Sequence, residues 1–262
     1  MKIKAFGVGN WDDEKQFFDQ LPILKEWSER IYCFVPNIVD RICITPGSYS
    51  PVTQDILKEL DQLKIDVIQT PFFRRGDYSR INNYFRLGFM TGIWHSLLLD
   101  KNADTYELPY DLILHCQCRT LIGEDMSPYI ESFMERSDIL MAPMYTSKIG
   151  TSVDVGCMFM KPYAAKTYLS TGFRQSCDQD IDCMNCEYEA FLMFAKYWYN
   201  PWPNLLSTKQ KDSASTIPPS DYSIFRYNNI EDFCKLPIIS VGDKHIEKKY
   251  FNKWKKNHKI LK

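Results

Sequence analysis

Apolar and polar positions divide the first half of the chain into alternating strands and helices. Short apolar runs bounded by turn residues predict strands at 2–8, 41–45, 65–69 and 112–114. Amphipathic patterns between these runs predict helices at 12–31, 52–63 and 78–99. Strands separated by helices of this length are joined by crossover connections. The pattern therefore predicts an α/β fold with a mostly parallel central sheet flanked by helices.

The second half of the chain has shorter elements. Apolar runs predict strands at 139–142, 153–161 and 238–241, and helical patterns occur at 163–169, at 187–197 and from about residue 246. The stretch 201–219 is rich in Ser, Thr, Lys and Pro, which is typical of a polar surface loop. Because neither a repeat nor a boundary is visible, we expect one domain over 1–262, with a first half (1–125) and a second half (126–262) that ends in a basic helix.

The composition is that of an ordinary globular protein. The 262 residues are 45% hydrophobic, and the net charge of -1 gives no general reason to bind nucleic acid. No apolar run approaches the roughly 18 residues of a membrane span, and the chain opens with a predicted strand rather than a cleavable leader. We therefore expect a cytoplasmic protein with no membrane span and no nucleic-acid partner.

The chain has nine cysteines, and Cys177, Cys183 and Cys186 lie close together in the sequence. A structural zinc site needs four ligands, and the single Cys-x-x-Cys has neither a second pair nor a nearby His. An odd number of cysteines favours free thiols in a reducing compartment. We expect free thiols rather than a zinc site.

The most informative stretch is the end of the predicted strand at 112–114. There an apolar run leads directly into His115, Gln117 and Arg119. Alternation along a strand would place these three side chains on one face, where they could bind an anionic or hydroxyl-rich ligand. In open α/β sheets ligands bind outside the carboxyl ends of the strands. The alternative is a solvent-facing edge strand, but the uniform apolar run favours a central strand and a site.

Two more groups of residues are candidates for ligand binding or catalysis. Arg80 and Asn83 lie near the start of the predicted helix over 78–99, where they suit either a phosphate or a polar base; a solvated basic loop is an equal alternative. Asp154 lies inside the apolar stretch 153–161, so its carboxylate needs a defined partner. Glu187 and Glu189 begin the helical pattern at 187–197 and do not share a face.

Two glycines follow the first predicted strand, in Gly7-Val8-Gly9-Asn10-Trp11. A dinucleotide-binding fingerprint would have a third glycine, and here Trp11 stands where a backbone should approach phosphate. A Rossmann-type methyltransferase that binds S-adenosylmethionine is a second alternative, and a tight turn alone also explains the glycines.

The order of these elements resembles that of the nucleotide-sugar glycosyltransferases of the GT-A fold, including the WavE-like group that acts in lipopolysaccharide and polysaccharide biosynthesis. The resemblance covers about residues 1–200. It is carried by Arg80-Ile81-Asn82-Asn83-Tyr84, by Tyr110-Asp111-Leu112-Ile113-Leu114, and by the stretch 153–162. It implies that 1–125 is a nucleotide-binding half and that 126–262 is an acceptor half.

The resemblance implies a glycosyltransferase whose partners are a nucleotide-sugar donor and a glycan or lipid-linked acceptor. Residues implied in donor binding are Gly7, Asn10, Arg80, Asn83, His115, Gln117 and Arg119. An inverting reaction needs a carboxylate to take the acceptor proton, and Glu187, Asp154 and Glu189 are the candidates. A retaining reaction needs no such base, and both stereochemical outcomes stay open.

The chain departs from that family at its metal-binding motif. The family carries an acidic Asp-x-Asp type motif at the strand end, whereas this chain has His115-Cys116-Gln117-Cys118-Arg119 and no acid before Glu124. Mn²⁺ and Mg²⁺ prefer carboxylate oxygen. Three interpretations follow: Arg119 pairs directly with the diphosphate, His115 and His245 form a softer metal site, or the chain is an inactive binding or assembly module. We favour the first, because fixed cations also stabilise leaving-group charge.

Overall fold

The computed structural model describes residues 1–9, 11–46, 50–68, 109–135, 140–142, 144–147, 150–153, 157–162, 200–201, 237–240 and 248–260. The helices predicted over 78–99, 163–169 and 187–197 lie outside these residues, as does nearly all of the predicted loop over 201–219. The division of the chain into two functional halves stays a prediction.

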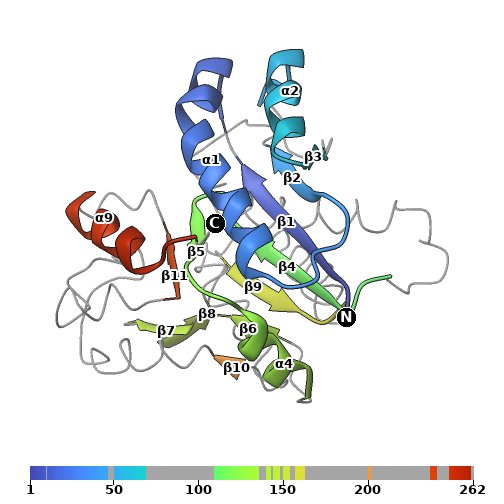
Figure 1. Ribbon diagram of the computed structural model, residues 1–262, viewed down its shortest axis with the longest axis vertical. Coiled ribbons are helices and arrows are strands. Elements are labelled where there is room, and N and C mark those ends of the chain that lie inside the picture. Colours follow the sequence, from blue (N-terminus) through green and yellow to red (C-terminus); the bar gives the residue numbers. More distant parts are fainter. Residues whose placement is uncertain are drawn as a thin grey trace, which may run out of the picture.

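A seven-stranded sheet forms the centre of the described fold, in the order β10-β6-β9-β4-β1-β2-β3 (Figure 1). Its strands are β1 (Ile3–Gly9), β2 (Ile42–Pro46), β3 (Ile65–Val67), β4 (Leu112–Cys116), β6 (Leu140–Ala142), β9 (Cys157–Met160) and β10 (Asn200–Pro201). β4, β1, β2 and β3 are parallel to one another, and β10 is parallel to β6. β9 alone in this sheet is antiparallel to its neighbours, β4 and β6. The predicted α/β fold with a mostly parallel sheet is confirmed.

The first helix, α1 (Glu14–Phe34), follows β1 and begins at a strong cap. Asp13 Oδ1 accepts from the backbone N–H of Gln16 at 2.7 Å, and the Gln16 side chain accepts from the backbone N–H of Asp12. The first bond satisfies a backbone donor that the first helical turn leaves open, and the second holds the residue before the cap. Apolar residues at three- and four-residue spacing then bury one side of the helix, with Trp27 fully buried.

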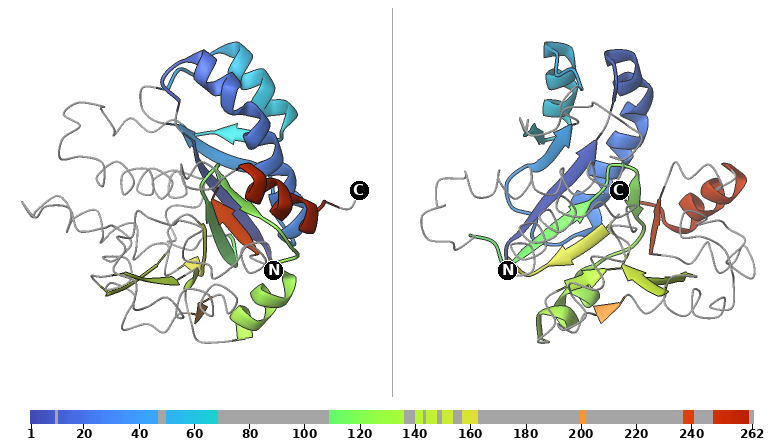
Figure 2. Two further views of the ribbon diagram at one scale, coloured as in Figure 1. Left: turned by 90° about the vertical axis from the view of Figure 1, so that its left-hand side faces the viewer. Right: turned by 180° about the vertical axis from the view of Figure 1, so that it is seen from behind.

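The second helix, α2 (Gln54–Gln62), begins at Thr53, whose hydroxyl accepts from the backbone N–H of Ile56. The same hydroxyl donates to Glu14 at 2.5 Å, so the first turns of α1 and α2 are tied together. Both helices lie on the same face of the sheet (Figure 2). They occupy the two crossovers β1–β2 and β2–β3, as right-handed connections in one direction require.

The core lies between this sheet face and α1. It contains Ile3, Ala5, Ile42, Ile44, Leu112, Leu114, Cys116 and Phe159 from the sheet, and Phe17, Leu24, Trp27 and Ile31 from α1. Each of these side chains is at most 5% exposed. Truncating a buried aromatic such as Trp27 to Ala costs ~3–5 kcal/mol. The opposite sheet face is also buried, since Phe6, Ile113 and Met158 are at most 1% exposed.

Two small sheets stand beside the central one. β5 (Thr120–Ile122) pairs in antiparallel fashion with β11 (Ile238–Ser240), and β7 (Met144–Ser147) with β8 (Gly150–Val153). The strand predicted over 153–161 is therefore wrong as a single element, because β8 and β9 belong to different sheets. Asp154, which that prediction placed inside a strand, lies outside the described residues.

Two further helices complete the described fold. α4 (Ser127–Glu135) follows β5, and α9 (Lys248–Asn257) follows β11. α9 agrees with the predicted basic helix, whereas α4 and β5 have no counterpart in the sequence prediction. Within the described residues, no helix is both long and apolar enough to cross a membrane.

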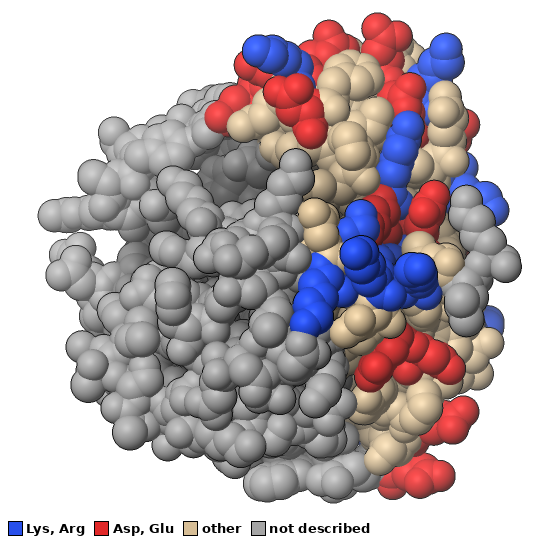
Figure 3. All heavy atoms as spheres, turned by 60° about the vertical axis from the view of Figure 1, so that its left-hand side comes forward, with Lys and Arg blue, Asp and Glu red and all other residues tan. Residues whose placement is uncertain are grey.

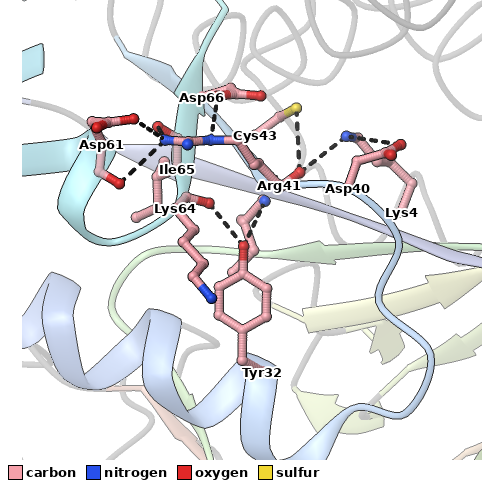
Figure 4. A network of polar contacts seen from close by, with 10 residues as sticks. Lys4, Tyr32, Asp40, Arg41, Cys43, Asp61, Lys64, Ile65 and Asp66 are labelled. Atoms are coloured by element: carbon pink, nitrogen blue, oxygen red, sulfur yellow. Dashed lines mark hydrogen bonds and ion pairs between the residues drawn. The ribbon is translucent and has the colours of Figure 1, made fainter.

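A polar network lies at the amino ends of β2 and β3, at the edge of the sheet opposite the carboxyl ends of the parallel strands (Figure 4). The Tyr32 hydroxyl donates to the carbonyl of Lys64 at 2.8 Å and accepts from the backbone N–H of Ile42 at 3.1 Å. Arg41 Nε pairs with Asp66 Oδ1 at 2.7 Å. The network joins α1 to the starts of β2 and β3, so its role is to hold the layers together.

Candidate functional site

The candidate site lies where the carboxyl ends of β1, β2 and β4 come together. In the sheet register Phe6 is level with His115, and Gly9 is level with Pro46 at the end of β2. β2 and β3 lie on one side of β1 while β4 lies on the other, so the strand order reverses between β1 and β4. In open α/β sheets ligands bind outside the carboxyl ends of the strands at such a reversal.

A tight turn connects β4 to β5 at this edge. β4 ends at Cys116, and the backbone N–H of Thr120 donates to the carbonyl of Gln117 at 2.8 Å. The predicted alternation that would place His115, Gln117 and Arg119 on one strand face is therefore wrong, because the chain leaves the strand before Gln117. We call residues 117–119 the β4–β5 turn.

The three polar residues differ in exposure as a result. His115 is 3% exposed and lies in the sheet between Phe6 and Met158, its register partners in β1 and β9. Gln117 is half-buried, and Arg119 is exposed. Of the three, Arg119 is the side chain that solvent and a soluble ligand reach most readily.

Close packing against neighbouring side chains accounts for both glycines of β1. A Cβ atom on Gly7 would lie 2.5 Å from Trp27 Cη2 and 3.0 Å from Cys118 Sγ. A Cβ atom on Gly9 would lie 2.8 Å from Ile44 Cδ1. These distances are shorter than ordinary contacts, so Gly7 lets β1 approach α1, and Gly9 leaves room for the side chains of Ile44 and Trp11. Gly7 is thus at the predicted edge, but its missing side chain leaves room for the protein's own core.

Trp11 is fixed at the corner after β1 and is not available to a ligand. Its indole Nε1 donates to the carbonyl of Pro51 at 2.7 Å, and its backbone N–H donates to Ser50 Oγ at 3.3 Å. The ring is 2% exposed and packs edge-on against Phe17. Trp11 therefore joins the β1–α1 corner to the segment that precedes α2.

The N-terminus of α1 is unsuited to phosphate. Dinucleotide-binding folds place the pyrophosphate on the first helix, where free N–H groups and the helix dipole attract anions. Here Asp12, Asp13 and Glu14 put three carboxylates at that position, and Asp13 already accepts the N–H of Gln16. The arrangement speaks against a dinucleotide site at Gly7-Val8-Gly9.

Three thiols gather beneath the β4–β5 turn. Cys116 is level with Cys157 in the antiparallel neighbour β9, and both are fully buried. Cys116 Sγ contacts the carbonyl of Thr120 at 3.3 Å. Burial, and secondarily the neighbouring Cys116, raises the pKa of the Cys118 thiol well above its ordinary value. Residue Cys118 is half-buried as a whole, but its sulfur lies against Gly7, which agrees with that direction.

The first carboxylates after β4, those of Glu124 and Asp125, make hydrogen bonds at the start of α4. Asp125 Oδ1 accepts from the Ser127 hydroxyl at 2.6 Å and from its backbone N–H at 2.9 Å, which lowers the pKa of the carboxyl group. Glu124 accepts from the Tyr129 hydroxyl at 2.6 Å. Burial, then the hydrogen bond to Glu124, raises the pKa of Tyr129 to about 12. These carboxylates serve α4 rather than the strand end.

A divalent cation of the kind the GT-A family uses does not fit the end of β4. The sequence has no Asp or Glu between Leu112 and Gly123. In the parts of the chain that the structure describes, no three His, Cys, Asp or Glu side chains lie together as a metal site would require. Hard cations such as Mg²⁺ need several oxygen ligands.

The remaining predicted site residues fall outside the described part of the chain. These are Asn10, Arg80, Asn83, Asp154, Glu187, Glu189 and His245. The structure therefore brings together Gly7, His115, Gln117 and Arg119 at one edge. It adds Cys118 and Thr120, whose places in the turn and at the start of β5 depend on where β4 ends. The Cys-Gln-Cys sequence at the end of this strand is the signal available for Cys118, and it does not include Thr120.

Comparison with known proteins gives the fold. No protein-family model matches the sequence, and no curated protein matches it. Two solved structures of the glycosyltransferase GlyE from Streptococcus pneumoniae TIGR4 superpose with TM-scores of 0.53 and 0.51 at 10% and 12% identity, over 98% of this chain and 60% of GlyE. The bifunctional glycosyltransferase WbbM superposes with a TM-score of 0.51 at 10% identity, over 98% of this chain and 49% of WbbM.

The chain thus spans about half to three fifths of the length of these structures. At identities this low the likeness establishes the architecture. The fold is of the GT-A type, as the order of sequence elements predicts, and GlyE and WbbM, which it resembles, are glycosyltransferases.

Proposed function

We propose that the chain is a glycosyltransferase that moves a sugar from a nucleoside-diphosphate sugar to a hydroxyl group of a glycan or lipid-linked acceptor, without a divalent cation. The observation that carries the proposal is the β4–β5 turn. It stands at the carboxyl edge where the strand order reverses, it exposes Arg119, and it has no carboxylate. The glycosyltransferases among the structural neighbours support the same class of reaction.

Arg119 has the chemistry that the departing diphosphate requires. When the bond between the sugar and the nucleotide breaks, negative charge develops on the phosphate oxygens. A guanidinium group offers two parallel N–H donors to such oxygens and stays charged at all physiological pH values. A fixed cation at this position stabilises the leaving group in the transition state. Gln117, two residues earlier, adds an amide that can hydrogen-bond a sugar or phosphate oxygen.

The second chemical task is to take the proton from the acceptor hydroxyl. In an inverting reaction a carboxylate does this as the hydroxyl attacks the anomeric carbon. We assign this task to one of Glu187, Asp154 and Glu189, on the strength of the sequence resemblance alone. In a retaining reaction none of the three acts as this base.

Thermal unfolding with candidate donors tests the proposal. The protein would be heated with UDP-, GDP-, CMP- and dTDP-sugars, each with EDTA and each with Mn²⁺. A donor present at about 100 times its dissociation constant adds ~2.7 kcal/mol to the stability of the folded protein. We expect one nucleoside-diphosphate sugar to raise the melting temperature equally under both conditions.

Three results would contradict the proposal in different ways. Stabilisation by none of the donors would remove the donor site. Stabilisation only with Mn²⁺ would replace the direct role of Arg119 by a metal site. Stabilisation without any sugar transfer or donor hydrolysis would indicate a binding or assembly module. S-adenosylmethionine serves as the control ligand, since its binding would favour the methyltransferase alternative.

A further inference from the structure

The β4–β5 turn is held differently at its two ends. On one side it continues from β4, which lies between β1 and β9 in the central sheet. On the other side it leads into β5, which within the described residues pairs with β11 and with no other strand. Thr120 begins β5 and is level with Ser240. The position of the second end therefore depends on residues from the other end of the chain.

Gly123, which follows β5, makes further contacts with residues near β11 and α9. Its backbone N–H donates to the carbonyl of Pro237 at 2.6 Å. Its carbonyl oxygen lies 3.1 Å from Nδ1 of His258, which donates when that nitrogen carries the proton. A Cβ atom on Gly123 would lie 2.6 Å from Trp254 Cζ2 and 2.8 Å from the His258 ring. The end of β5 and the helix α9 are in such close contact that only glycine fits.

Arg30 of α1 contacts both β5 and the residues of α9 and its C-terminal end. It is 2% exposed, and its Nη1 donates to the carbonyl of Ile122 at 3.2 Å and to that of His258 at 3.0 Å. Its guanidinium lies 4.9 Å from the centre of the Trp254 ring, a cation–π contact. Glu26 accepts from Arg30 Nη2 at 3.0 Å, so the buried cation is neutralised. α1, β5 and α9 thus meet at one guanidinium.

α9 reaches this position by burying one side and exposing the other. Trp254 is fully buried and His258 is 9% exposed, whereas Lys256 and Lys259 are exposed. Figure 3 shows Lys and Arg side chains gathered on this face of the molecule, around α9. Lys255 Nζ pairs with Glu26 at 2.5 Å, which ties the helix to α1 a second time. We call β11 and α9, with the adjoining Pro237 and His258, the C-terminal brace.

We propose that the C-terminal brace holds the β4–β5 turn in the position at which Arg119 and Gln117 meet the donor, and that Gly123 is a positioning residue for donor binding. This inference rests on the proposed function, because it takes the ligand of the β4–β5 turn to be the sugar donor. Arg119 is four residues from Gly123, and β5 is the connection between them. A displacement of about 1 Å at a binding group can reduce rate or affinity about 100-fold.

The test is the substitution Gly123→Ala, measured by hydrogen exchange and by donor titration on the full chain. The added methyl group forces Trp254 and His258 away from β5. We expect the N–H of Thr120, which closes the turn, to exchange about tenfold faster than in the wild type, because local opening becomes easier. We expect donor binding to weaken about tenfold, while exchange in β1 and in Leu112–Leu114 stays unchanged.

The matched control is Tyr32→Phe, which removes two hydrogen bonds at the opposite edge of the sheet. It should lower the melting temperature without changing either the Thr120 exchange rate or donor affinity. If Gly123→Ala does not fold, His258→Leu replaces it, because that change keeps the side-chain bulk and removes the contact with the Gly123 carbonyl.

Two results overturn the inference. If a folded variant has lost melting temperature but Thr120 exchanges at the wild-type rate, the brace does not hold the turn. If the exchange rate rises but donor affinity is unchanged, Gly123 is not a positioning residue. If the wild type binds no donor at all, the proposed function fails, and the exchange measurement still decides whether the brace holds the turn.

Discussion

Gly7 of β1 lies so close to Trp27 of α1 that a Cβ atom on the glycine would stand 2.5 Å from Cη2 of the indole. The indole is fully buried, so it has little freedom to move aside. The separation between the first strand and the first helix is therefore set by the absence of one methyl group, directly below the candidate site.

Gly7→Ala should reduce the free energy of unfolding by ~1–3 kcal/mol, because the extra methyl group overpacks the core. Urea denaturation measures the loss. In a chain that also carries Trp27→Leu the methyl group has space, so the two changes should be strongly non-additive. Simple addition of the two losses would show that the close approach of Gly7 and Trp27 does not govern the stability of this layer.

Arg30→Met should cost ~3–5 kcal/mol of stability, because Glu26 and the carbonyls of Ile122 and His258 would lose a buried partner. Arg41→Met is the matched control. Arg41 also makes two ion pairs, with Asp61 and Asp66, but its side chain is 37% exposed. Exposed pairs contribute ~0–1 kcal/mol each. Similar losses for the two variants in urea denaturation would contradict the central role of Arg30.

Arg119→Ala should weaken nucleotide-sugar binding by at least about tenfold, since a charge-assisted hydrogen bond contributes ~1.5–3 kcal/mol. Because Arg119 is exposed, the melting temperature without ligand should hardly change. Isothermal titration measures the affinity, and Arg41→Ala, an arginine at the far edge of the sheet, serves as control. Unchanged affinity in Arg119→Ala would remove this residue from the donor site.

Tyr129 should make the stability fall at alkaline pH. Its pKa is raised from 10.0 to about 12 in the folded state, first by burial and then by Glu124. The stability that comes from keeping the phenol neutral is fully present below about pH 10, and it is lost as the pH rises towards about 12, because the unfolded chain ionises first. Between about pH 9 and about pH 11, the free energy of unfolding should fall more in the wild type than in Tyr129→Phe. An equal fall in both proteins would contradict this assignment.

Cys118 should react with iodoacetamide at least about tenfold more slowly than Cys33, because the thiolate is the reactive form and its raised pKa leaves little of it near neutral pH. Cys33 is exposed and provides the comparison within the same molecule. Peptide mass spectrometry after timed alkylation gives both rates. Equal rates would indicate that the β4–β5 turn opens readily in solution.

The layers of the fold follow from sequence because the elements that make them are long and regular. The strands predicted over 2–8 and 41–45 are β1 and β2 to within a residue at either end, and the helix predicted over 12–31 is α1. Each carries a strong periodicity and a capping or turn signal. β5 has three residues, too few for a period to be visible.

The details of the site depended on tertiary contacts that no local pattern contains. The sequence correctly predicts that a central strand, β4, carries polar residues at its carboxyl end, whereas the use of this edge as a site stays a prediction. Where β4 stops depends on its pairing with β1 and β9, so the separation of buried His115 from exposed Arg119 was not predictable. The close approach of Gly7 to Trp27 was equally unpredictable, because it depends on where α1 packs against the sheet.

The contact between Arg30 and His258 joins residues 228 positions apart, and this has a consequence for the order of folding during synthesis. Chains generally fold from the N-terminal side as they leave the ribosome. β1, β2, β3 and both of their helices find their partners within the first 68 residues, except that β1 waits for β4. The brace cannot close until residue 258 has been made. A nascent chain therefore forms β1, β2 and β3 well before residues 237–258 are available to hold the β4–β5 turn.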